Sequence, residues 1–295
     1  MKEIKSEVKA EKEKFFKDLE SHVLTTISEK QGKLLKGAQE KEASSWLSSF
    51  PLKKHGFALN AQEFRDAIAL RYGWVIKDTP LFCACGKSNS IDHTLTCDLG
   101  GYTIMRHNAL RDSFAELLEE VCIDVKTEPG LLPVTNNTSI KGNKTDGARA
   151  DISARSVWSP CEKTFFDVQV SHPNATSHVQ KSFDTLYKEI ESSKKNEYND
   201  RILNIEKASF VPLAFSTTGG CGKEATKLIK HLSNKIANKR QELYSQVVSF
   251  IRTKLRFSLL KSTLIAIRGV RGKQRKQEDL IAYVDFSLLP RNFDL

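Results

Sequence analysis

The sequence lacks any long run of apolar residues. Its 295 residues contain no stretch approaching the roughly 18 apolar residues that a transmembrane helix requires. The first fourteen residues, MKEIKSEVKAEKEK, are charged throughout and lack the apolar segment of a secretory signal peptide. We therefore expect a soluble protein that remains inside the cell, long enough for one large domain or two smaller ones.

Acidic residues are scarce in one segment. Residues 222–276 contain fifteen Lys or Arg residues but only two acids, a local excess of +13, whereas the whole chain carries +10. Since the excess is localised, it predicts helices whose outward faces bind nucleic acid, with a solvated helical surface as the alternative. The residues expected to make these contacts are Lys239, Arg240, Arg252, Lys254, Arg256, Arg268 and Arg271.

The six cysteines are unevenly spread, and three of them lie within fifteen residues. Together with one histidine they form a Cys-x-Cys-x7-His-x3-Cys pattern made by Cys83, Cys85, His93 and Cys97. In a reducing compartment, clustered thiols favour metal binding over disulfides, and three thiolates with one imidazole suit tetrahedral zinc. Such a site is structural because the protein fills all four positions. Separate buried cysteines and a surface histidine are the alternative.

Two segments of strand character, residues 149–154 and 164–170, each carry one aspartate among apolar neighbours. These aspartates are Asp151 and Asp167. A carboxylate inside an apolar strand is costly to bury unless it is paired or binds a metal. The pattern predicts a divalent-metal site that cleaves phosphodiesters, and the same residues also fit two exposed aspartates in unrelated loops.

The order of the expected elements predicts the fold class. A helix from Asn108 to Val121 precedes a strand at 122–126 and the two aspartate strands, and a helix at 176–202 precedes a strand at 210–215. This order favours an α/β fold with a mixed four-stranded sheet flanked by helices. Residues 1–42 alternate Lys and Glu, which predicts a long exposed helix or a partly disordered arm.

The order of these motifs resembles a known arrangement. The Cys-Cys-His-Cys cluster is followed by Arg106-His107-Asn108, then by Arg149-x-Asp151, a second acidic strand and Lys195-x2-Tyr198. Over roughly residues 45–270 this resembles the C-terminal part of site-specific non-LTR retrotransposon polyproteins. There, a zinc knuckle precedes a restriction-like endonuclease of the PD-(D/E)XK superfamily. The resemblance implies a PD-(D/E)XK restriction-endonuclease-like core with a small zinc knuckle and helical extensions at both ends.

The resemblance also implies roles for individual residues. Asp151 matches the aspartate of the Pro-Asp element, Asp167 matches the second acid, and Lys195 with Tyr198 matches a lysine and tyrosine on the next helix. The four zinc ligands match, and Arg106 and His107 belong to a motif expected to contact nucleic acid.

The chain departs from the family pattern in three ways. Ala150 replaces the proline, Gln169 stands where the superfamily often has its lysine, and Lys195 is distant from Asp167 in the sequence. A helix that starts near Thr176 and returns at 1.5 Å per residue comes level with Asp167 near Lys188, so both lysines remain candidates.

These observations predict six regions: a charged helical arm (1–44), a helical linker region (45–80), the zinc knuckle (81–101), the endonuclease-like core (102–221), a basic helical extension (222–276) and a tail (277–295). The expected function is that of a DNA-nicking endonuclease in the nucleus, with structural Zn²⁺ and catalytic Mg²⁺ or Mn²⁺ at Asp151 and Asp167. DNA, or RNA, is the expected partner, with no membrane and no small-molecule substrate. The alternatives are an inactive nucleic-acid-binding module and an interaction scaffold built on the arm.

Overall fold

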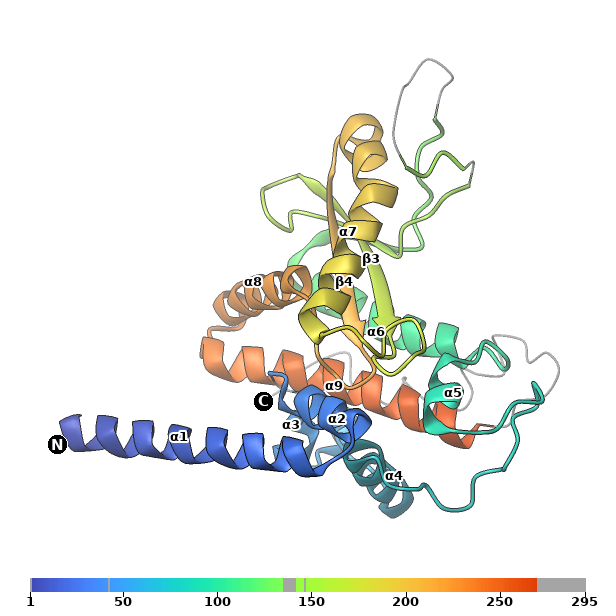
Figure 1. Ribbon diagram of the computed structural model, residues 1–295. Helices are drawn as coiled ribbons and strands as arrows, with labels where there is room; N and C mark the ends of the chain where they lie inside the picture. The colour runs from blue at the N-terminus through green and yellow to red at the C-terminus, as the bar shows by residue number, and fades with distance from the viewer. Residues whose placement is uncertain (1, 42, 135–141, 146, 270–295) are drawn as a thin grey trace.

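The structure is a computed structural model that describes residues 2–41, 43–134, 142–145 and 147–269 (Figure 1). Its helices surround one sheet, as the sequence predicts. The α-helices are α1 (Lys2–Thr26), α2 (Glu29–Gln39), α3 (Ser45–Ser48), α4 (Ala61–Tyr72), α5 (Ile91–Thr96), α6 (Tyr102–Val121), α7 (Phe183–Arg201), α8 (Lys223–Arg240) and α9 (Tyr244–Arg268). Two short turns, η1 (Lys53–His55) and η2 (Ile202–Glu206), follow α3 and α7.

The predicted mixed four-stranded sheet is confirmed. Its strands are β1 (Ile123–Thr127), β2 (Ile152–Arg155), β3 (Lys163–Ser171) and β4 (Ser209–Ser216), and they lie in the order β1-β2-β3-β4. β2 runs antiparallel to both of its neighbours, β1 and β3, whereas β4 is parallel to β3. A parallel pair needs a long crossover, and α7 provides it.

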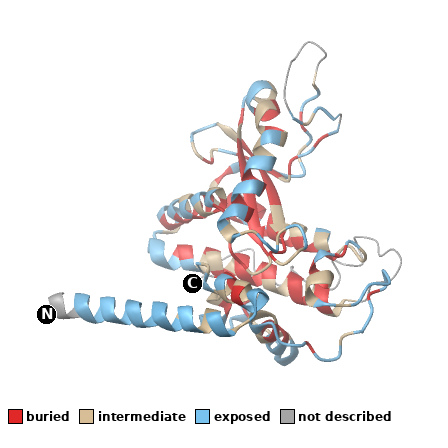
Figure 2. Cartoon of the chain, viewed as in Figure 1, coloured by how far each residue is buried: buried red, intermediate tan, exposed pale blue. Residues whose placement is uncertain are grey.

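The two faces of the sheet are covered by different helices. Alternate residues of a strand point to opposite faces. Phe166 and Val168 therefore join the large core formed with α6, α8 and α9, whereas Phe165 joins Tyr198 and Ile202 beneath α7. Figure 2 shows buried residues along β3 and β4 and on the helix faces turned toward them, whereas the edge strand β1 has no buried residue. Asp167 lies between Phe166 and Val168, so the strand alternation turns its side chain toward α7.

The start of α6 differs from the prediction. The helix begins at Tyr102 rather than at Asn108, since Gly100 and Gly101 adopt left-handed conformations (φ 89° and 69°) that turn the chain directly into it. Arg106 and His107 therefore lie within the first two turns of α6. Helix α4 begins with a capping box, in which the Asn60 side chain accepts the backbone N–H of Glu63.

The N-terminal arm is helical. Helix α1 projects away from the rest of the molecule and is exposed along nearly all of its length (Figures 1 and 2). Helix α2 is anchored to the core, because Lys33 Nζ donates to the backbone carbonyls of Pro173, His178 and Val179 at 2.7–2.8 Å. No helix of the described residues is long and apolar enough to cross a membrane.

A chain of polar contacts connects the arm, α5 and the sheet. Lys30 of α2 pairs with Asp92 of α5, and Asp92 Oδ1 lies 3.0 Å from His172 Nε2 at the end of β3. The other ring nitrogen, Nδ1, lies 2.8 Å from the Thr217 hydroxyl. Burial lowers the pKa of His172, so the ring is neutral at pH 7. With Asp92 accepting from Nε2, the Thr217 hydroxyl donates to Nδ1.

The buried position of His172 predicts that its side chain contributes to the free energy of unfolding. Replacing it with Ala leaves Asp92 with Lys30 alone and removes the ring nitrogen that the Thr217 hydroxyl contacts. We expect His172→Ala to lower the free energy of unfolding by about 2–4 kcal/mol, against about 1 kcal/mol for Thr217→Val, which removes one hydroxyl. Urea titrations followed by circular dichroism measure both values. Equal values for the two variants would contradict the assigned role of His172.

Candidate functional site

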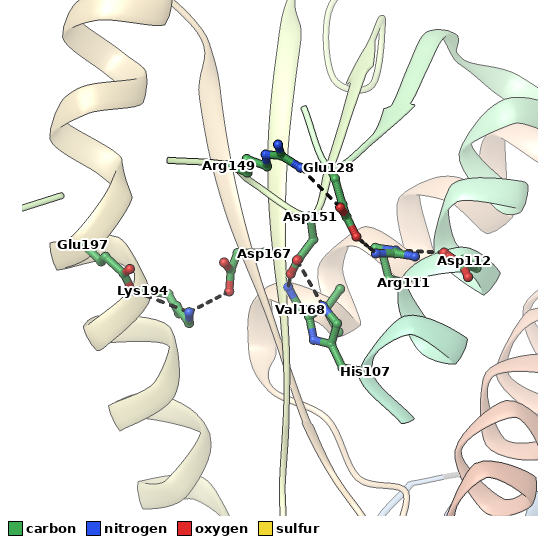
Figure 3. A network of polar contacts seen from close by, with 10 residues as sticks. All are labelled: His107, Arg111, Asp112, Glu128, Arg149, Asp151, Asp167, Val168, Lys194 and Glu197. Carbon is green, nitrogen blue, oxygen red and sulfur yellow. Dashed lines mark hydrogen bonds and ion pairs between the residues drawn. The ribbon is translucent and has the colours of Figure 1, made fainter. Parts of the chain in front are cut away.

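Asp151 lies beside the stretch of β3 that carries Asp167. It immediately precedes β2, whose Ile152 pairs with Phe166 in the antiparallel β2–β3 ladder, and its backbone N–H donates to the Phe166 carbonyl at 3.0 Å. Just before the first residue of β2, the Asp151 side chain continues the hydrogen bonding between the strands, because its Oδ2 accepts the backbone N–H of Val168 at 2.6 Å. Figure 3 shows the two carboxylates on either side of β3.

Asp151 is held by His107 of α6. His107 Nε2 lies 3.0 Å from Asp151 Oδ1, and both side chains are partly buried. With Val168 on one oxygen and His107 on the other, the orientation of the carboxylate is fixed (Figure 3). His107 was expected to contact nucleic acid. Its contact in the structure is with Asp151.

Asp167 is 5% exposed and forms an ion pair with Lys194 of α7, whose Nζ lies 3.1 Å from Oδ2. The contact is not aligned as a hydrogen bond. Burial and the negative charge of Asp151 raise the pKa of Asp167 to about 6, although Lys194 opposes the shift. Burial lowers the pKa of Lys194, but the charges of Asp167 and Glu197 outweigh this effect and raise it above its usual value.

The lysine beside Asp167 is neither of the two candidates. Lys195 pairs with Glu224 of α8, and Lys188 is exposed. Helix α7 begins at Phe183, after its N-cap Ser182, and not near Thr176. Because the helix starts about seven residues later than expected, the residue that lies level with Asp167 is also about seven residues further along the chain, near Lys194. Neighbouring residues of a helix point about 100° apart, so only Lys194 faces the sheet at this level.

Tyr198 and Gln169 lie next to this pair. Tyr198 follows Lys194 by one helical turn, and its buried ring packs on Phe210 with 5.5 Å between centroids. Lys194 Nζ lies 5.5 Å from the centre of the Tyr198 ring, so the tyrosine supports the lysine. Gln169 lies two residues after Asp167 on the same side of β3, and its amide nitrogen is 3.4 Å from the Ser171 hydroxyl.

Several residues of the site were not predicted. Lys194 Nζ is 3.5 Å from a carboxylate oxygen of Glu197. On the other side of the sheet, Glu128 pairs with Arg111 and Arg149, and its backbone N–H donates to the Asp151 carbonyl at 2.8 Å (Figure 3). The spacing of Glu197 and Lys194, three residues apart on one helix, was the one available sequence signal.

The four predicted zinc ligands come together. Their donor atoms all lie within 4.8 Å of one another, with 3.9 Å between the sulfurs of Cys83 and Cys97 and 3.2 Å from Cys85 Sγ to His93 Nε2. Tetrahedral zinc with bonds of about 2.3 Å holds its sulfur ligands roughly 3.8 Å apart. The backbone N–H of Lys87 lowers the pKa of the Cys85 thiol, which favours the thiolate that binds metal. This group could therefore bind a metal ion such as zinc.

The pair of Asp151 and Asp167 offers fewer metal-ligand atoms than the cysteine–histidine cluster. Within the described ranges, the Cys-His cluster is the one His/Cys/Asp/Glu group of three or more donors close enough together to share an ion. A cation at Asp151 and Asp167 would thus depend on two carboxylates and on oxygens from water or substrate. Mg²⁺ accepts such sites, because it usually keeps several waters and binds through one or two carboxylates plus phosphates.

Two of the residues predicted to contact nucleic acid are buried. Arg106 is 3% exposed and donates to the Leu95 carbonyl at 3.0 Å, and burial lowers its pKa to about 10. Arg256 is also buried, and Arg252 lines a small cavity beside Glu40. The expected outward orientation is therefore wrong for Arg256, and Arg106, expected to contact nucleic acid, is buried against Leu95 instead.

The remaining cations meet acids from other segments. Arg240 forms a two-pronged pair with Glu120 at 2.5 and 2.7 Å, and Lys239 donates to the Glu120 backbone carbonyl. Lys254 pairs with Glu116, and Arg268 pairs with both oxygens of Asp66 at 2.7 Å. Arg271 and the predicted tail lie outside the described residues. Counting charge within one segment overestimated the basic surface, since α4 and α6 supply the neutralising carboxylates.

No protein-family model matches the chain, and no curated protein matches its sequence. The function of the chain is therefore inferred from its own residues and their geometry.

The cysteine–histidine group predicts a zinc content that can be measured. We expect one zinc ion per chain by elemental analysis. Cys97→Ser should lose the ion, whereas Cys161→Ser should keep it, because Cys161 is exposed and outside the cluster. Chelation should unfold residues 81–101, since a structural zinc contributes on the order of 10 kcal/mol to the folding of such a segment. Equal zinc contents in the two variants would rule out this ligand set.

Proposed function

We propose that the chain is a metal-dependent endonuclease that nicks DNA, with a core of the PD-(D/E)XK type and a zinc knuckle at residues 81–101. One observation carries the proposal. Asp151 lies beside the stretch of β3 that carries Asp167, close enough for its charge to raise the pKa of Asp167, and each aspartate has a basic side chain beside it, His107 at 3.0 Å and Lys194 at 3.1 Å. Paired carboxylates with a lysine are the groups that metal-assisted phosphodiester hydrolysis needs.

Asp151 and Asp167 would hold the divalent cation. When bound, Mg²⁺ or Mn²⁺ polarises the scissile phosphate and lowers the pKa of the attacking water. Asp167 must lose its proton to act as a ligand, and the positive charge of Lys194 favours that ionised form. His107 and the Val168 N–H keep the Asp151 carboxylate in one orientation, so little reorganisation is needed.

Lys194 would stabilise the charge that develops on the phosphorus centre. Its ammonium group is a compact point charge, and such a charge contributes most in a site that excludes water. Tyr198 and Glu197 act as positioning residues, because both contact Lys194 from the same helix. Gln169 would bind water or backbone through its amide. In this scheme Lys194 takes the role that the motif resemblance gave to Lys195.

The zinc knuckle would serve as a fixed platform beside the core. Asp92 immediately precedes the expected ligand His93 and is bound to His172 of the core, so the metal site and the sheet are directly connected. A DNA substrate implies a nuclear location, and RNA remains an alternative substrate with the same phosphate chemistry.

The second candidate function is an inactive nucleic-acid-binding module. Ala150 in place of the proline and the ion pair that occupies Asp167 favour it. A module of this kind would retain nucleic acid through phosphate contacts, with affinity that falls steeply as salt increases, but would not hydrolyse it.

A plasmid-nicking assay separates the two. Supercoiled plasmid is incubated with the zinc-loaded chain and Mg²⁺ or Mn²⁺. We expect Asp151→Asn and Asp167→Asn to lower the nicking rate at least about 100-fold, because several kcal/mol of metal-dependent stabilisation are lost. Lys194→Ala should cost about 10²–10³-fold, whereas Lys195→Ala, its neighbour on the same helix, should leave the rate nearly unchanged. Nicking that persists in all four variants would end the nuclease proposal.

The raised pKa of Asp167 predicts the pH dependence of the same reaction. Below pH 6 the carboxylate is increasingly protonated, so the logarithm of the nicking rate should rise with a slope of about one up to pH 6 and then level off. A higher Mg²⁺ concentration should move the rising part of this pH profile to lower pH, since the cation favours the ionised form of Asp167. A rate that does not change between pH 5 and pH 7 would contradict the role of Asp167.

A further inference from the structure

Two aromatic rings form an exposed stacked pair where α4 ends. Tyr72 is the last residue of the helix, and Gly73 caps it in a left-handed conformation (φ 67°). The Trp74 N–H then donates to the Ala69 carbonyl at 2.8 Å, which folds the chain back on the helix. The Tyr72 and Trp74 rings consequently lie 5.1 Å apart at an interplanar angle of 24°.

The geometry of this pair depends on the glycine. A Cβ at position 73 would lie 2.8 Å from Leu34 Cδ1, and the positive φ is unfavourable for other residues. The stack is therefore built into the helix cap and is not a chance contact of two mobile side chains.

Neither ring serves the hydrophobic core. Tyr72 is 49% exposed and Trp74 is 57% exposed, and neither belongs to the buried clusters of the described residues. Leaving half of a tryptophan in water gives up burial free energy that an interior position would provide. A fixed, exposed aromatic face is a feature of binding surfaces, since singly scattered apolar residues lack this order.

A positive charge lies beside the Tyr72 ring. The Arg71 guanidinium carbon is 5.8 Å from the centre of the Tyr72 ring, and Arg71 Nη1 donates to the neutral hydroxyl of Ser44. Arg71 is half-buried with its Nε enclosed, and within the described part of the chain no carboxylate forms an ion pair with it, so no acid neutralises its charge. Flat π surface and positive charge together match a nucleobase with its phosphate.

We propose that Arg71, Tyr72 and Trp74 form a stacking platform for an unpaired base of a single nucleic-acid strand. The inference rests on the proposed function in one respect, namely that nucleic acid is the substrate. It adds that the protein binds DNA with locally separated strands, because a base can stack on these rings only after it leaves the duplex. Stacking tolerates any base, so the platform carries affinity without sequence preference.

The test measures binding without cleavage. A fluorescein-labelled single strand of oligo(dT), about 20 nucleotides long, is titrated with the zinc-loaded chain in buffer without Mg²⁺. A strand of this length spans more than the roughly 4–16 nucleotides that one such surface covers. We expect Trp74→Ala to raise the Kd about 5- to 150-fold and Trp74→Phe to retain most of the affinity. The Kd for the matched duplex should change little.

A matched control exists at the other end of the molecule. Phe16 of α1 is 54% exposed, lies in an edge-to-face pair with Phe15 and has Lys12 Nζ 5.9 Å from its centre. It therefore offers an exposed ring with a cation but no parallel stack. Phe16→Ala should leave the Kd for oligo(dT) unchanged, and unaltered zinc content shows that each variant is folded.

Two results would overturn the platform. One is a Trp74→Ala variant that binds oligo(dT) as tightly as the unaltered chain. The other is an unaltered chain that does not bind oligo(dT). If in that case the Trp74→Ala variant also loses self-association, the rings belong to a protein contact instead. If plasmid is never nicked but oligo(dT) binding still requires Trp74, the nuclease proposal fails and the platform stands.

Discussion

The antiparallel pairing of β2 with β3 is the constraint on which the candidate site depends. Its register pairs Ile152 with Phe166 and so brings Asp151 beside the stretch of β3 that carries Asp167, with one carboxylate on each side of that strand (Figure 3). The Asp151 carboxylate itself continues the ladder by accepting the Val168 N–H. The hydrogen bonding that fixes the strands therefore also fixes the site, and the elements that carry His107 and Lys194 pack against the two faces of this frame.

The site reduces the stability of the fold. Because the pKa of Asp167 is raised in the folded chain, its protonated form favours folding below about pH 4, and this contribution is lost as the pH rises through about 6. At neutral pH a buried, ionised Asp167 is held mainly by Lys194. Natural proteins retain such costly groups where function requires them, which agrees with a ligand role for this carboxylate.

The sequence predicted those parts that depend on local pattern. The four strands, the crossover helix and the convergence of the cysteine–histidine group all follow from spacing and periodicity. Lys194 could not be predicted, because its position depends on where α7 begins, and a shift of a few residues changes which lysine faces the sheet. The ion pairs of Arg240 and Arg268 were missed for a related reason. Their partners Glu120 and Asp66 lie more than 100 residues away, and charge counted along the chain does not show which acids the fold brings near.

The central claim is that Asp151 and Asp167 share a divalent cation. A crystal structure of the zinc-loaded chain soaked in Mn²⁺, with data collected at the manganese absorption edge, tests it most directly. The account predicts an anomalous-scattering peak between the two carboxylates, within about 2.3 Å of an oxygen of each, and no such peak in crystals of Asp167→Asn. Manganese bound elsewhere, with Lys194 still paired to Asp167 and no peak between the aspartates, would contradict it.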